Sequence, residues 1–127
     1  MVQAATIALA WFTTLHDIDN GFVVDKDFEG NVGHLLHGMI GIMVMPVLAL
    51  ILLIVSFFAK VPGGVKWAGL VLLAVILQVV LAIISFDVPA IGALHGINAL
   101  VLAGVAGMAA ARAGSAAPDR KTEPAAA

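Results

Sequence analysis

The chain has 127 residues, of which 62% are hydrophobic and 11% are charged, and its formal net charge is −2 at neutral pH. A soluble domain of this length has too small an interior to bury so much apolar surface, so the composition excludes an ordinary soluble fold and predicts an all-α membrane protein. The absence of cysteine excludes disulfides, thiolate metal ligands and covalently attached c-type haem, and no basic tract indicates nucleic-acid binding.

The first apolar segment, residues 2–16, is shorter than the roughly 17–25 apolar residues that a membrane-spanning helix needs. No basic residue precedes the segment, which disfavours a signal peptide. We therefore expect a short helix here. Two explanations for its length stay open: the helix is abbreviated, or translation starts upstream of Met1.

Three further segments, residues 32–59, 67–86 and 90–111, are long and apolar enough to span a bilayer. Helix-breaking residues separate them, at 62–64 and at Pro89, and Pro46 predicts a kink inside the segment 32–59. The four helices predict a four-transmembrane-helix bundle over residues 1–112. A disordered cytoplasmic tail is expected over residues 113–127, which are rich in Ala, Pro and charge.

Charges in the connecting segments predict the orientation. The stretch 17–29 carries five acidic residues against Lys26 alone, whereas Lys60, Lys66 and Arg112 border the opposite helix ends. The positive-inside rule then places residues 60–66 and both termini in the cytoplasm. We expect a multi-pass protein of the plasma membrane, the bacterial inner membrane, with the lipid bilayer as its main partner.

All four histidines fall near the outer membrane face in this topology. His16 and His34 lie close enough to the interface to be ordinary solvated residues. His37 and His95 lie deeper, where an ionisable residue normally points into the bundle and has a partner. Because imidazole suits zinc and copper as well as iron, a metal site built from His16, His34, His37 and His95 also stays open.

The two deeper histidines occur in related sequences, Leu36-His37-Gly38 and Leu94-His95-Gly96. The preceding segments also match loosely, with Gln3 corresponding to Gln78. These matches predict that the bundle consists of two helical-hairpin repeats related by a pseudo-twofold axis. That symmetry would place His37 opposite His95 at one depth, which is the arrangement that b-type haem ligation uses.

Small and polar residues near these histidines have two interpretations each. Gly38 and Gly96 would leave room for a flat macrocycle, but small residues such as Gly92 and Gly96 also let membrane helices approach closely. Gln78 would line a haem or quinone pocket, or would simply hydrogen-bond a neighbouring helix, and Asn98 invites the same two readings.

The His-Gly pairs and Gln78 resemble those of a family of uncharacterised bacterial four-helix integral membrane proteins with His-Gly motifs in helices 2 and 4. More distantly, the duplicated hairpin is similar to one half of haem A synthase, whose four-helix halves hold haem between two helix histidines. The resemblance implies that His37 and His95 are axial-ligand candidates. No Glu or Asp lies inside a helix near either histidine, which departs from the synthase pattern, so the resemblance implies haem binding or electron transfer rather than synthase chemistry.

Two functions follow as expectations. The first is a membrane protein that binds haem b between His37 and His95 and serves electron transfer, or haem or quinone handling, within or beside a respiratory assembly. The second is a structural or accessory subunit, or a small homo-oligomer, whose histidines only tie helices together. The sequence leaves open whether the protein is an enzyme.

Overall fold

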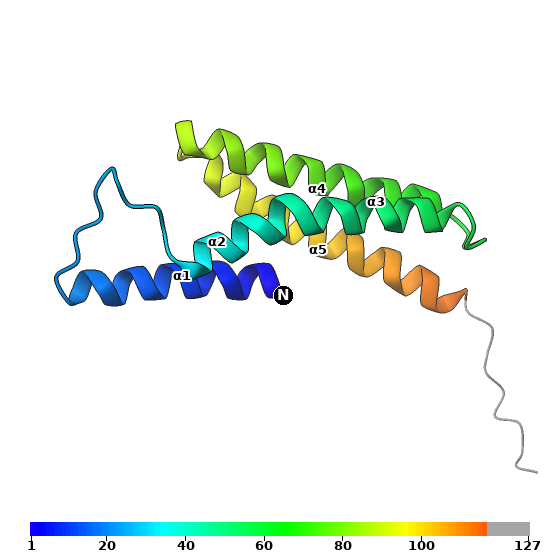
Figure 1. The fold of residues 1–127 in the computed structure, drawn as a ribbon. Coiled ribbons are helices and arrows are strands. Elements are labelled where there is room, and N and C mark those ends of the chain that lie inside the picture. The colour runs from blue at the N-terminus through cyan, green and yellow to red at the C-terminus, as the bar shows by residue number, and fades with distance from the viewer. Residues whose placement is uncertain (117–127) are drawn as a thin grey trace, which may run out of the picture. The chain divides into compact units, whose positions relative to one another are not determined.

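The computed structural model describes residues 1–116, which form helices joined by turns and loops and contain no strand (Figure 1). The elements are α1 (Val2–Asp19), α2 (Val32–Met39), the π-helical turn η1 (Ile40–Val44), α3 (Met45–Ser56), α4 (Gly64–Asp87) and α5 (Ile91–Ser115). Their contacts divide the chain into two compact units, Met1–Leu48 and a second unit that begins at Ala49. The prediction of an all-α protein is confirmed.

Three continuous helices are long and apolar enough to cross a membrane: Val32–Ser56, Gly64–Asp87 and Ile91–Ser115. At most 17% of the residues in their apolar windows are buried inside the protein, so their large hydrophobic side chains need lipid around them. The chain is therefore a membrane protein. Helix α1 is not among these candidate spans, and its role as a fourth span stays a prediction.

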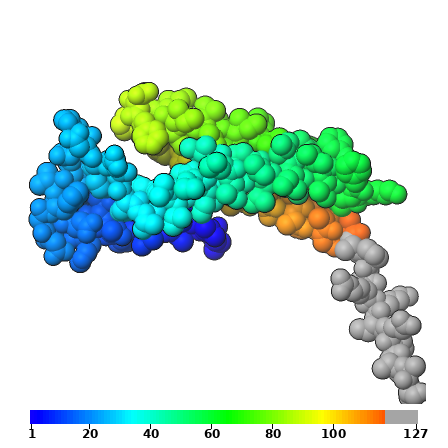
Figure 2. Space-filling view, in the orientation of Figure 1, coloured from blue at the N-terminus to red at the C-terminus, as the bar shows by residue number. Residues whose placement is uncertain are grey.

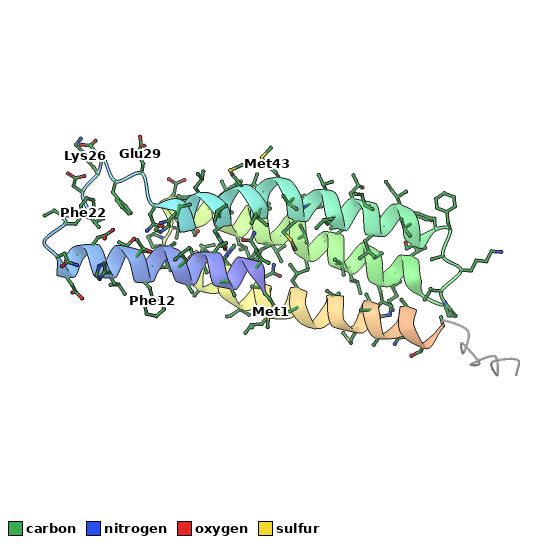
Figure 3. The ribbon with its side chains drawn as sticks, turned by 60° about the horizontal axis from the view of Figure 1, so that its bottom comes forward. Met1, Phe12, Phe22, Lys26, Glu29 and Met43 are labelled. Carbon is green, nitrogen blue, oxygen red and sulfur yellow. The ribbon has the colours of Figure 1, made fainter. Side chains whose placement is uncertain are left out.

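The first unit pairs α1 with α2 across the loop of residues 20–31. Figure 2 shows this loop, in light blue, at the end of the unit where α1 ends and α2 begins. Lys26 and Glu29 lie on the loop and point away from the helices, whereas Phe12 points outward from α1 (Figure 3). Phe12 is 73% exposed, as expected of an apolar side chain that faces lipid.

A π-helical turn precedes Pro46 in the second apolar segment. The amide of Met45 bonds the carbonyl of Ile40, five residues earlier, instead of the usual four. Proline has no N–H and its ring crowds the carbonyl four residues before it, so a wider turn relieves the crowding at this point. The predicted local distortion at Pro46 is a π turn inside an otherwise continuous helix.

The second unit is dominated by the hairpin of α4 and α5, which lie antiparallel and side by side (Figure 1). Its core is built from small side chains on α4, namely Ala68, Val71, Ala74 and Val75, with Asn98 from α5 buried against them. Small residues let two helices approach closely where no hydrophobic effect drives them together. The short connection between Asp87 and Ile91 fixes their antiparallel order.

The helix ends differ modestly from the predicted ones. Helix α1 continues to Asp19 rather than residue 16, and the second apolar helix ends at Ser56 because residues 57–59 turn away. Helix α5 continues to Ser115, so residues 113–115 of the predicted tail are helical. Residue 116 lies in a turn, and residues 117–127 of that tail lie outside the described residues.

Candidate functional site

His95 and Gln78 form the polar centre of the second unit. His95 lies in the second turn of α5 and Gln78 lies in the middle of α4, and both are half-buried. The Nδ1 atom of His95 is 3.0 Å from the main-chain oxygen of Gln78. The side-chain Nε2 of Gln78 is 3.0 Å from the carbonyl oxygen of His95 and 3.1 Å from its Nε2.

The chemistry of these atoms fixes where the protons are. A carbonyl oxygen only accepts, so Nδ1 of His95 carries the hydrogen and its Nε2 carries a lone pair. The Gln78 amide has two hydrogens, one for each contact with His95. Its oxygen accepts from Nδ2 of Asn98 at 2.6 Å, and Asn98 also donates to the carbonyl of Ala74 at 2.9 Å. Every donor therefore meets an acceptor, and His95 is the neutral Nδ1–H tautomer.

His37 makes the corresponding contact in the first unit. Its Nδ1 lies 3.0 Å from the main-chain oxygen of Gln3 on α1, so Nδ1 of this ring also carries a hydrogen. The same carbonyl accepts from the hydroxyl of Thr6 at 3.1 Å. Gly41 makes room for the Gln3 side chain, because a Cβ at this position would lie 2.8 Å from Nε2 of Gln3.

Both deep histidines therefore donate Nδ1–H to the main-chain carbonyl of a glutamine on the preceding helix. The partners are 34 residues apart in the first unit and 17 residues apart in the second. The longer loop at residues 20–31, against residues 88–90, accounts for about half of this difference. Most of the rest arises because Gln3 lies at the start of α1, far from its last residue, whereas Gln78 lies in the middle of α4. The sequence match between Gln3 and Gln78 indicated that these two residues correspond. It did not predict that their main-chain oxygens would accept hydrogen bonds from the histidines.

His34 has a different role. Its Nδ1 accepts the N–H of Asn31 at 3.2 Å, so its ring carries the proton on Nε2, opposite to His37 and His95. The ring also packs edge-on against Trp11, with centroids 5.5 Å apart, and against Phe28, at 5.9 Å. His34 is thus part of the helix cap rather than a simply solvated side chain.

His16 is exposed at the end of α1, where its Nε2 lies 3.3 Å from the amide nitrogen of Asn20. This position agrees with its interpretation as a surface residue. Within residues 1–116, no three side chains of His, Asp or Glu gather closely enough to hold a metal ion. The open alternative of a metal site built from several histidines thus gains no support from the described part of the chain.

Gly38 and Gly96, which follow the two deep histidines, share an open environment. Apart from its chain neighbours and the nearby backbone of its own helix, a Cβ built on either would meet no heavy atom of the described residues within 4 Å. Close helix packing therefore does not explain these two glycines within the described residues. By contrast, a Cβ on Gly92 would touch the Cβ of Ser85 at 3.8 Å, an ordinary packing contact.

The contacts that Asn31 and Gly33 make between α2 and α1 were not predicted from the sequence. The Asn31 side chain accepts from the amides of Gly33 and His34 and donates to the carbonyl of Ala10 at 2.8 Å and to the hydroxyl of Thr14 at 3.1 Å. Gly33 packs directly on α1, because a Cβ there would lie 2.4 Å from the backbone nitrogen of Ala10. An Asn directly before an apolar helix was the available signal for the cap.

Comparisons of this chain with protein-family models, with curated proteins and with solved structures find no match.

Proposed function

We propose that this membrane protein binds a b-type haem with His37 and His95 as the axial ligands, and that it serves electron transfer or haem or quinone handling. The observation that carries the proposal is the shared contact from Nδ1–H of each histidine to a glutamine main-chain carbonyl, at 3.0 Å in both units. We also propose that the duplicated hairpin is distantly similar to one half of haem A synthase.

This contact is the one expected of a ligating histidine. A histidine that binds a metal through Nε2 almost always donates its other ring N–H to a carbonyl, a carboxylate or water, which fixes the tautomer, orients the ring and raises the basicity of Nε2. His34, whose Nδ1 is an acceptor, lacks this arrangement. The hydrogen bonds therefore favour His37 and His95 over His34 as iron ligands, and His16 is exposed at the end of α1.

The glycines beside the two histidines fit a haem, whereas one contact of Gln78 would have to change. The open space beside Gly38 and Gly96 suits a flat ring placed next to each imidazole. At His95, ligation through Nε2 would require the Gln78 side-chain amide to leave its position 3.1 Å from that atom, because one lone pair cannot serve both partners. The contact from Nδ1 of His95 to the Gln78 carbonyl does not involve that side chain and is compatible with ligation through Nε2.

When bound, haem would supply one-electron chemistry, and the protein would set its potential through the axial ligands and their hydrogen bonds. The chain's own contribution is to hold each of the two imidazoles in a fixed orientation. The carbonyls of Gln3 and Gln78 perform this positioning, because they accept from Nδ1 whether or not Nε2 is engaged.

We further infer that α1–α2 and α4–α5 are two copies of one helical hairpin. The recurrence of the same two residue types in the same contact supports this repeat, together with the similar position of each histidine near the start of its helix. We also propose that the end of the second unit that carries Lys60, Lys66 and Arg112 faces the cytoplasm of a bacterial cell, by the positive-inside rule.

An absorption spectrum tests the haem proposal directly. We expect a reduced-minus-oxidised difference spectrum of the purified protein, expressed with added haem precursor, to show a b-type band. His37→Ala and His95→Ala should each lose the band, while His16→Ala should keep it, because His16 is exposed and lies outside both contacts. A band that survives both substitutions would refute these ligands.

The second candidate function is a structural or accessory subunit without a cofactor. The satisfied network of Gln78, His95 and Asn98 favours it, since such hydrogen bonds tie helices together without any ligand. In that case no b-type band appears even with ample haem, and His95→Ala only lowers the thermal stability of the protein.

A further inference from the structure

The basic end of the second unit contains an apolar cavity. The end of α3, the start of α4 and the end of α5 border this partly open cavity of about 260 Å³, which is lined mainly by apolar side chains that include Val55, Ala59, Ala68, Ala106 and Ala109. This volume is slightly below the roughly 300–1,000 Å³ of sites that enclose a whole drug-sized ligand. The cavity therefore suits a segment of one hydrocarbon chain better than a whole molecule.

Arg112 forms the rim of this cavity. Its guanidinium lies 5.0 Å from the centre of the Trp67 ring, which itself lines the cavity. Arg112 also borders a more open depression with Pro62, Ser115 and Ala116. The exposed guanidinium thus lies where an apolar cavity meets a wider opening, and stacking on Trp67 leaves its N–H donors available.

Among the described residues, the charges at this end have no counter-ion. Lys60 lies in the turn that precedes α4, Lys66 lies in the first turn of α4, and Arg112 lies in the last turn of α5. In the part of the chain that the structure describes, the single ion pair joins Lys26 to Asp27, so none of these three cations has an acidic partner. The one acidic residue described in the second unit, Asp87, lies at the opposite end of α4.

From this combination we propose that the second unit binds an anionic phospholipid, with part of one acyl chain in the cavity and the phosphate on the Arg112 guanidinium. Arginine binds phosphate through parallel, charge-assisted hydrogen bonds, and basic pockets between membrane helices are known to take anionic head groups. Lys60 and Lys66 add attraction for a head group with net negative charge over a zwitterionic one. The site lies apart from His95 and is independent of haem binding.

Native mass spectrometry of the full chain, released from detergent with defined lipids, tests the site. The protein is mixed with equal amounts of phosphatidylglycerol and phosphatidylcholine that carry the same acyl chains. We expect phosphatidylglycerol adducts to dominate. Arg112→Gln should weaken phosphatidylglycerol binding about tenfold, the effect of losing one charge-assisted interaction. Lys26→Gln, which removes a cation in the first unit, should leave binding unchanged.

A second pair of variants tests the cavity without altering charge. Ala106→Leu places a larger side chain in the cavity and should reduce lipid retention, whereas Ala103→Leu, on an exposed part of α5 that does not line the cavity, should not. Circular dichroism in detergent checks that each variant keeps its helices. Equal retention of the two lipids by the wild type, or unchanged phosphatidylglycerol binding in both Arg112→Gln and Ala106→Leu, would overturn the proposal.

Discussion

Gln78 contacts both ring nitrogens of His95. The main-chain carbonyl of Gln78 accepts from Nδ1 at 3.0 Å, and its side-chain amide nitrogen lies 3.1 Å from Nε2. Both nitrogens of one imidazole are thereby tied to a single residue of the neighbouring helix. This double contact fixes the rotation and the axial position of α5 against α4, which apolar packing alone defines weakly in a bilayer.

The amides of Gln78 and Asn98 should be energetically coupled, because the Asn98 amide bonds the Gln78 oxygen at 2.6 Å and is only 7% exposed. We expect Gln78→Leu and Asn98→Leu each to destabilise the protein by about 1–3 kcal/mol. In a double-mutant cycle, the coupling should be about 0.6–1.7 kcal/mol, measured by unfolding in mixed detergent. Ser85→Ala serves as the control, since that hydroxyl bonds within its own helix. Strict additivity of the two main substitutions would contradict the contact.

Gly33 should not tolerate a side chain. A Cβ at this position would lie 2.4 Å from the Ala10 nitrogen and 2.6 Å from its Cα, and backbone atoms cannot move aside cheaply. Gly33→Ala should therefore force α2 away from α1 and cost about 1–3 kcal/mol, measured as a lower thermal midpoint by circular dichroism. Gly104→Ala, whose added Cβ meets nothing within 4 Å among the described residues, should keep or raise that midpoint. An equal response of the two variants would show that Gly33 is not a helix contact.

Asn31 should contribute two separable effects. Its oxygen caps α2, and its amide nitrogen binds the Ala10 carbonyl and the Thr14 hydroxyl on α1. Asn31→Ala removes both and should cost about 2 kcal/mol or more, whereas Asn31→Ser keeps a capping oxygen and should recover about 1 kcal/mol of that loss. Thermal unfolding of the two variants measures the difference. If serine restored full stability, the bonds to α1 would contribute nothing.

The predicted orientation can be tested cleanly because the chain has no cysteine. Glu29→Cys places one thiol in the acidic loop, and Lys60→Cys places one in the turn before α4. In intact cells, a membrane-impermeant maleimide should label Glu29→Cys, while Lys60→Cys should react only after permeabilisation. Labelling of both thiols in intact cells, or the reverse pattern, would refute the proposed topology.

The residues near the histidines show which features of the site can be predicted from the sequence. It placed His37 and His95 at similar positions in their helices and singled out Gln78, because these features depend on position along the chain. It left open whether Gln78 lines a pocket or bonds a helix, and the structure shows the hydrogen bonds to α5. It placed His34 at the solvated interface, and the structure instead shows His34 as a partner in the Asn31 cap.

What the sequence alone determined is the membrane class, the three long spans and the approximate ends of the helices. A bilayer imposes these residue by residue, since each span needs a run of apolar side chains that ends at charge, Pro or Gly. Only the tertiary structure decided the partners of the histidines, the close approach at Gly33 and the cavity beside Arg112. Helices that are apolar on all sides carry no polar-to-apolar stripe that encodes their rotation, so the atoms that meet are known only once the helices are packed.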